Sequence, residues 1–127
     1  MIAAADVALD PFPWGGGVST LDSFAAGTPV ITAPSLQTVV QLAAGMYRKM
    51  GMGSVDGECC VAADIDQYVS MAVSVARNST LRQEVSRHIT ASRDRVYDDK
   101  SSLVEWREIL LRLGAEARLV MERTKHP

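Results

Sequence analysis

The sequence predicts an α/β protein with a narrow parallel sheet and a helix-rich carboxyl-terminal half. Two short apolar runs, residues 7–9 and 29–32, flank a helical stretch within thirty residues, which is the spacing of a βαβ crossover. Both runs are continuously apolar, as expected of parallel strands buried on both faces. From residue 64 onward, apolar residues recur at helical spacing.

The first strand is predicted over Val7 to Leu9, the following loop over residues 10–17 and the crossover helix over residues 18–26. The loop contains three consecutive glycines, which lack Cβ atoms and allow both a tight bend and close approach of a ligand to the backbone. In open α/β sheets, ligands bind outside the carboxyl ends of the strands, where a helix N-terminus meets an anion. We therefore expect a phosphate-binding crevice here, suited to a diphosphate.

The next elements follow from capping signals. Gly27 is typical of a helix C-cap and Pro29 prevents continuation of the helix, so the second strand begins there. A helix is predicted over residues 36–50 and a short third strand over residues 59–62. Asp64 and Gln67 form a capping-box pattern that opens a helix through Ala76.

The carboxyl-terminal half continues with two predicted helices. Residues 78–80 break the preceding helix, and residues 81–96 form the next one. Ser102 and Glu105 form a second capping-box pattern, which starts the last helix, and residues 123–127 are expected to fray.

Composition limits the class of protein. The chain has 127 residues, 47% of them hydrophobic, which suffices for one core. No run approaches the roughly 20 apolar residues of a membrane span, and the N-terminus lacks the basic region of a signal peptide. We therefore expect a soluble, unsecreted protein of the cytoplasm, and in a eukaryote also of the nucleus, with no membrane partner. Cys59 and Cys60 are adjacent, which disfavours a disulfide or zinc site and favours buried thiols.

Charge disfavours a nucleic-acid partner. The net charge is −2, with residues 77–127 carrying eleven basic and eight acidic side chains. Basic and acidic residues alternate there, and only Tyr97 and Trp106 are aromatic. This pattern is typical of a solvated helical face.

Three short strands make an incomplete sheet, so the chain is expected to be the trailing part of a larger doubly wound domain. The run from Ala8 to Thr32, ALDPFPWGGGVSTLDSFAAGTPVIT, resembles the donor-binding segment of the protein O-linked N-acetylglucosamine transferases and their SPINDLY-type relatives. The shared pattern is a strand ending in LDPFP, an aromatic residue, a glycine pair, a hydroxyl-rich turn, an acidic residue and GTPVIT. The segments QTVVQLAAGMYRKMGM and DQYVSMAVSVARNSTLRQEV resemble the helices that follow in these proteins.

This resemblance implies a GT-B fold, in which residues 1–127 are the C-terminal portion of a nucleotide-sugar-binding domain with a partial Rossmann-like sheet. The donor motif covers residues 6–32 and the helical part residues 64–122. The resemblance also implies donor-binding residues. Backbone amides of the turn would hold the diphosphate and an acidic residue the ribose, at Gly16, Gly17, Val18, Ser19, Thr20 and Asp22.

Alternatives remain for several of these residues. Asp22 can accept two hydrogen bonds from a ribose diol, or form a capping box with Ser19. Trp14 either stacks on a ligand or packs the loop onto the sheet. Asp10 is expected to accept hydrogen bonds from turn N–H groups rather than to act in catalysis.

The sequence departs from the family at two positions. Val18 replaces the usual Thr, which removes one hydroxyl donor. Gly17 matches the SPINDLY-type members, whereas some animal-type members carry His.

The implied activity is transfer of a sugar, N-acetylglucosamine from UDP-GlcNAc, to Ser or Thr hydroxyls of proteins. The alternatives are a SPINDLY-like O-fucosyltransferase that uses GDP-fucose or another sugar nucleotide, and a non-catalytic interaction module. No acid–base pair accompanies the motif, so no catalytic residue is assigned. No metal or other cofactor is expected, and the isolated chain is predicted to be inactive.

Overall fold

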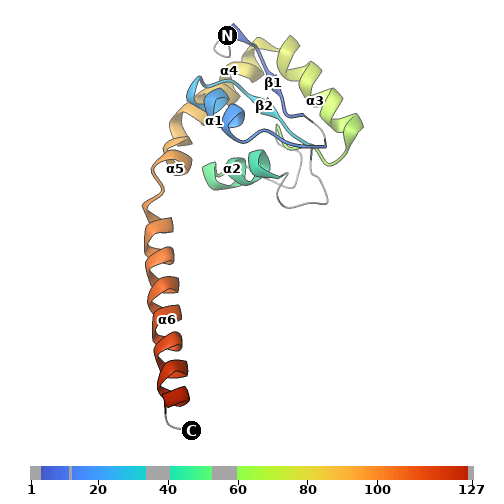
Figure 1. Cartoon of the computed structure of the whole chain (residues 1–127). Coiled ribbons are helices and arrows are strands. Elements are labelled where there is room, and N and C mark those ends of the chain that lie inside the picture. Colours follow the sequence, from blue (N-terminus) through green and yellow to red (C-terminus); the bar gives the residue numbers. More distant parts are fainter. Residues whose placement is uncertain (1–3, 12, 34–40, 53–59, 126–127) are drawn as a thin grey trace. The chain divides into compact units, whose positions relative to one another are not determined.

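The computed structural model describes residues 4–11, 13–33, 41–52 and 60–125. The contacts divide the chain into two compact units, Met1–Tyr97 and Asp98–Pro127. The first unit holds two strands and five helices among its described residues, and the second holds one helix (Figure 1). In chain order these are β1 (Ala8–Leu9), α1 (Val18–Ala25), β2 (Val30–Ile31), α2 (Leu42–Met50), α3 (Ile65–Arg77), α4 (Ser79–Ser92), α5 (Asp94–Tyr97) and α6 (Lys100–Lys125).

The two strands are parallel, with Ala8 opposite Val30 and Leu9 opposite Ile31. The helix α1 connects them, which confirms the predicted βαβ crossover (Figure 1). The predicted third strand is reduced to a single parallel bridge between Thr32 and Val61, and Cys59 lies outside the described residues. The described part of the sheet is therefore narrower than the sequence predicted, and it is not a full doubly wound sheet.

The side chain of Tyr47 bonds to the backbone of β2. Its hydroxyl accepts a hydrogen bond from the Val30 N–H and donates one to the Val30 carbonyl, each at 2.9 Å. Two residues later, the Thr32 N–H and carbonyl bond instead to the backbone of Cys60 and Ala62, at 2.8 Å each. The phenol thus takes the place of a strand partner at Val30, and the buried backbone groups are still satisfied.

The core of the first unit lies around Phe24 and Tyr47, whose rings meet edge to face with centroids 4.9 Å apart. This single core agrees with the expectation from composition. Its buried members are Phe24, Val30, Ile31, Tyr47, Met50, Cys60, Val75, Val85 and Ile89.

Glycine ends α1 as predicted. Gly27 has a φ of +73°, in the left-handed region. The Gly27 N–H donates to the Phe24 carbonyl at 3.0 Å and the Thr28 N–H to the Ser23 carbonyl at 2.8 Å. These two bonds form a Schellman motif, which turns the chain into β2.

Side-chain caps set the limits of α3 and α4. The Asp64 carboxylate accepts the Gln67 N–H at 2.8 Å, which confirms the predicted helix start, while the Gln67 side chain accepts the Ala63 N–H at 2.5 Å. Asn78 ends α3 and caps α4 by accepting the Leu81 N–H at 3.1 Å. The next helix therefore begins at Ser79, two residues before the predicted start.

Two of the predicted helix limits were wrong, and a third lies outside the described residues. The predicted helix over residues 81–96 is two helices, α4 and α5, separated at Arg93. The capping box of Ser102 and Glu105 does not open α6, because Asp99 accepts the Ser101 N–H at 3.1 Å and the helix begins at Lys100. The predicted start of α2 lies within residues 34–40, outside the described residues.

Candidate functional site

The glycine loop is fixed by the carboxylate of Asp10, which follows β1 and is 6% exposed. One oxygen, Oδ1, accepts the Gly16 N–H at 2.6 Å, and Oδ2 accepts the Thr32 hydroxyl at 2.7 Å. The expected role of Asp10 as an acceptor of turn N–H bonds is confirmed. A single buried carboxylate therefore joins the end of β1, the loop and the end of β2.

A third segment reaches the same residue from α3. The Tyr68 hydroxyl donates a hydrogen bond to the backbone carbonyl of Asp10 at 2.9 Å. Burial, and secondarily the negative charge of Asp10, raise the pKa of Tyr68. The sequence analysis assigned no role to Thr32 or Tyr68. A hydroxyl at the end of the second strand was the available signal for Thr32, whereas nothing in the sequence indicated Tyr68.

Gly16 occupies a position where an added side chain would force neighbouring side chains to move. An added Cβ would lie 2.6 Å from Ser19 Oγ and 2.9 Å from Thr20 Oγ1. The Thr20 hydroxyl also donates to the Gly16 carbonyl at 3.0 Å. The Gly16 peptide is thus held on both sides, by Asp10 and by Thr20. Its N–H group is directed to Asp10 and not into the crevice.

The other predicted amides belong to the first turn of α1. Gly17 is the N-cap, and no side chain caps this helix. Helix geometry provides no intrahelical acceptor for the first four N–H groups, which here are those of Gly17, Val18, Ser19 and Thr20. The partial positive charge of the helix N-terminus adds to these donors. This arrangement can bind an anion.

The predicted side chains divide into two groups. Thr20 is buried and its hydroxyl serves the loop, whereas Val18, Ser19 and Asp22 are exposed. Val18 and Asp22 are four residues apart and therefore share one exposed face of α1. The capping-box alternative for Ser19 and Asp22 was wrong, because Ser19 lies inside the helix and Gly17 occupies the cap position.

Tyr97 of α5 contacts α1, where its hydroxyl donates to the Leu21 carbonyl. Burial is the largest cause and raises the pKa of Tyr97, whereas a backbone hydrogen bond at Ala25 and the charge of Arg93 lower it and the charge of Asp22 raises it slightly. Asp22 therefore has an electrostatic neighbour in Tyr97.

Apolar side chains border the loop. Trp14 is 67% exposed, so its side chain does not pack the loop onto the sheet. Leu42, the first residue of α2, lies beside Gly17, since a Cβ added there would be 3.5 Å from Leu42 Cδ1. Both Trp14 and Leu42 therefore leave apolar surface next to the predicted crevice. Among the described residues, no group of three or more His, Cys, Asp or Glu side chains is placed to hold a metal ion.

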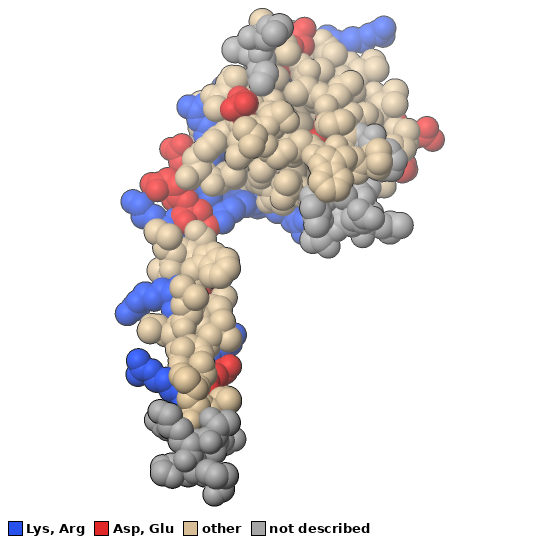
Figure 2. Space-filling view, in the orientation of Figure 1, with Lys and Arg blue, Asp and Glu red and all other residues tan. Residues whose placement is uncertain are grey.

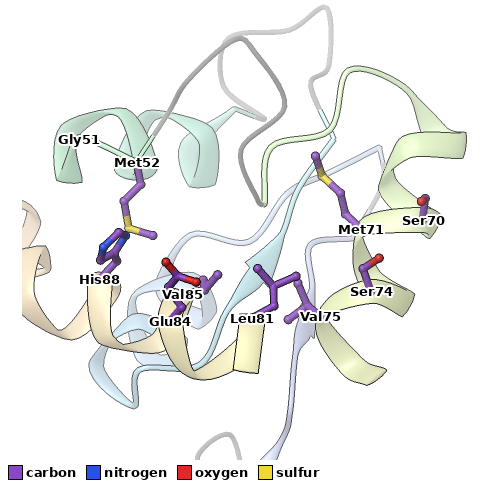
Figure 3. Close-up of a pocket in the computed structure, with 10 residues that line it drawn as sticks. All are labelled: Gly51, Met52, Ser70, Met71, Ser74, Val75, Leu81, Glu84, Val85 and His88. Atoms are coloured by element: carbon purple, nitrogen blue, oxygen red, sulfur yellow. The ribbon is translucent and has the colours of Figure 1, made fainter. Parts of the chain in front are cut away.

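A separate cavity of about 550 Å³ lies between α3, α4 and the end of α2 (Figure 3). Apolar side chains, including Val75 and Val85, line it together with polar groups such as Glu84 and His88. No residue of the predicted donor site lines this cavity.

Comparison with known proteins identifies relatives of this chain. No family model matches it. A probable UDP-N-acetylglucosamine–peptide N-acetylglucosaminyltransferase SPINDLY of Oryza sativa subsp. japonica is 30% identical over 80 residues, which is 63% of this chain. The corresponding protein of Eustoma exaltatum subsp. russellianum is 32% identical over 75 residues, or 59% of this chain. The chain is related in sequence to the SPINDLY-type O-GlcNAc transferases.

The fold supports this relationship. A mutant O-GlcNAc transferase of Thermobaculum terrenum superposes on 74% of this chain with a TM-score of 0.54 and 21% sequence identity. The match covers 19% of that transferase, and the matched segments cover 8% of each of the two SPINDLY relatives. The resemblance predicted from the sequence is confirmed, and the described fold is similar to that of a segment of the Thermobaculum terrenum protein. Within the part that the structure describes, no helix is long and apolar enough to cross a membrane.

Proposed function

We propose that this chain is the donor-binding part of a glycosyltransferase that moves a sugar from a nucleoside diphosphate to Ser or Thr hydroxyls of proteins. The bond between Asp10 and Gly16 carries the proposal, since it fixes the loop that leads into the uncapped N-terminus of α1. The relatives named as UDP-GlcNAc peptide transferases support N-acetylglucosamine as the sugar. GDP-fucose is the alternative donor.

The diphosphate binds at the start of α1 in this proposal. The N–H groups of Gly17, Val18, Ser19 and Thr20 donate to phosphate oxygens, and the helix dipole favours their negative charge. Because Asp10 and Thr20 already hold the loop, little order has to be gained on binding. The same donors stabilise the charge that develops on the leaving diphosphate, as an oxyanion hole does.

The ribose binds to Asp22, one turn further along the exposed face of α1. A carboxylate accepts two charge-assisted hydrogen bonds from a vicinal diol. With the capping box excluded by the position of Gly17, a ligand contact is the role that we propose for this exposed carboxylate.

The chain supplies binding rather than acid–base chemistry in this proposal. The general acid and the general base belong to other parts of the intact transferase. The acceptor site and the contacts to the nucleobase of the donor also lie there. No metal is needed, because the amides and the helix dipole carry the diphosphate charge. We expect the isolated chain to bind nucleotide weakly and to transfer no sugar.

Calorimetric titration of the purified chain with UDP and with GDP, without divalent metal, tests the proposal. We expect weak binding of one diphosphate that Asp22→Ala reduces at least fivefold. Glu84→Ala serves as the matched control, because it removes an exposed carboxylate that lines the separate cavity. Equal loss of binding in both variants contradicts the assignment of Asp22 as a ligand of the ribose. Saturable binding of the same affinity in the Asp22→Ala variant contradicts it as well.

A further inference from the structure

Two side chains at the short helix α5 hold the carboxyl-terminal half of α1. The guanidinium of Arg93, which directly precedes α5, donates a hydrogen bond to the Ala25 carbonyl. The hydroxyl of Tyr97, the last residue of α5, donates to the Leu21 carbonyl. The helix α1 has eight residues and is about 12 Å long at 1.5 Å per residue. Because so short a helix moves as one body, contacts along its second half also set the direction of its first turn.

The bond from Arg93 completes the carboxyl end of α1. The last carbonyls of a helix have no partner within the helix. Here the N–H groups of residues 26–28 bond to three of them, those of Asp22, Ser23 and Phe24. The fourth, the Ala25 carbonyl, accepts the bond from Arg93, and a cation at this end also favours the helix dipole. Arg93 is therefore a cap of α1 supplied by a residue 68 positions later.

The helix α5 holds the end of α2 in the same way. Arg95 donates to the Met50 carbonyl at 3.3 Å, and a Cβ added at Gly51 would lie 3.2 Å from the same guanidinium nitrogen. At their other ends α1 and α2 are neighbours, since Leu42 lies beside Gly17. Figure 1 shows α5 next to both helices. Both helices that border the proposed diphosphate site are thus held from their carboxyl ends by α5.

The contacts of α5 are mainly polar. Figure 2 shows charged side chains of both signs close together on the surface at α5. Val96 is the residue of α5 whose apolar side chain packs against the core. Apolar packing has no preferred direction, whereas a hydrogen bond weakens steeply when it is bent. The hydrogen bonds of Arg93 and Tyr97 therefore fix how α1 lies against α5.

We propose that Arg93 and Tyr97 are positioning residues for donor binding, which hold α1 so that its first-turn amides and Asp22 face the same nucleoside diphosphate. This inference rests on the proposed function. Neither side chain has to touch the ligand. Without its bonds to α5, the helix α1 tilts more freely, and part of the binding free energy is then used to order it.

Calorimetric titration of the full chain with UDP and with GDP tests the role of Arg93. We expect Arg93→Met to weaken binding about threefold or more, because α1 must then be ordered on binding. Arg82→Met is the matched control, since Arg82 likewise donates to carbonyls at a helix end, those of Val75 and Ala76 in α3, at 3.1 and 2.9 Å. Both variants lose one positive charge and an arginine bond to a helix end, but only Arg93 contacts α1. Unchanged affinity in Arg93→Met, or equal weakening by both variants, overturns the proposal.

Amide chemical shifts of the nucleotide-free chain test the positioning of α1 directly. We expect the shifts of residues 17–19, which lie two or more positions before Leu21, to change in Arg93→Met and in Tyr97→Phe and to stay the same in Arg82→Met. Unchanged shifts at residues 17–19 in the first two variants overturn the positioning role. Because no nucleotide is present, these shifts decide that role even if neither UDP nor GDP binds to the wild-type chain, an outcome that would contradict the proposed function alone.

Discussion

The Oδ1 atom of Asp10 lies 2.6 Å from the Gly16 nitrogen, and this bond closes a loop between residues six positions apart, directly before a helix N-terminus. The second carboxylate oxygen holds Thr32 at the end of the neighbouring strand. The geometry of the proposed diphosphate site therefore depends on a buried acidic residue that does not itself face the ligand.

Replacing Asp10 is expected to destabilise the protein. Asp10→Ala leaves the Gly16 N–H and the Thr32 hydroxyl without their acceptor, at a cost of about 2 to 4 kcal/mol. Urea unfolding followed by circular dichroism measures the change. The exposed Asp22→Ala, expected within about 0.5 kcal/mol of wild type, is the control. A loss below about 1 kcal/mol for Asp10→Ala would refute the anchoring role.

Neighbouring glycines are expected to differ in tolerance. Gly16→Ala places a Cβ 2.6 Å from Ser19 Oγ, whereas Gly17→Ala places one 3.5 Å from Leu42 Cδ1, an ordinary contact. Overpacking at Gly16 should cost about 1 to 3 kcal/mol and shift the loop. Amide chemical shifts of residues 15–22 should change widely in Gly16→Ala and locally in Gly17→Ala. Similar responses in the two variants would show that the close contacts of Gly16 are unimportant.

The Tyr47 hydroxyl is expected to stabilise β2. Tyr47→Phe removes the partner of both backbone groups of Val30, and the expected cost is about 2 to 3 kcal/mol. Tyr97→Phe removes a hydroxyl from a half-exposed ring and should cost about 1 kcal/mol or less. Thermal and urea unfolding of the two variants provide the comparison, and equal losses would contradict the prediction.

Two tyrosines are expected to make stability fall at alkaline pH. The pKa values of Tyr68 and Tyr97 are raised in the folded protein, so the unfolded chain loses these protons first, from about pH 10 upward. Stability from this source is complete below pH 10 and declines as the pH rises through the folded pKa values. Asp10→Asn should lower the pKa of Tyr68 only part of the way to 10, because burial is the larger cause. Tyrosinate absorbance, with Tyr68→Phe for assignment, measures the pKa values, and urea unfolding at a series of pH values measures the change in stability.

Local signals in the sequence predicted much of the fold. Gly27, Asp64 and the apolar runs of the crossover act on groups within about five residues, so their pattern identified a helix end, a helix start and two strands. Asn78 was predicted as a break, and the structure shows that it also caps the following helix. At α6, the Asp99 carboxylate accepts the Ser101 N–H and the helix begins at Lys100, before the Ser102 pattern.

Contacts between distant residues were not predictable in the same way. The bonds of Asp10 to Thr32 and of Tyr68 to Asp10 join residues 22 and 58 positions apart. The bond between Tyr47 and Val30 spans 17 positions. Packing of the whole unit determines these contacts. The glycine turn was predicted from the sequence. The hydrogen bond that joins Asp10 to Thr32 at the end of the second strand was not.

The phenol of Tyr47 also limits how molecules of this protein can associate. An open strand edge is a template for pairing with other chains and leads to aggregation. At Val30 both backbone groups of that edge are already bonded to one hydroxyl, so an incoming strand finds no donor or acceptor there. Within the described residues, the Tyr47 hydroxyl therefore closes β2 to a further strand at Val30, and residues 60–62 already pair with the same edge at Thr32.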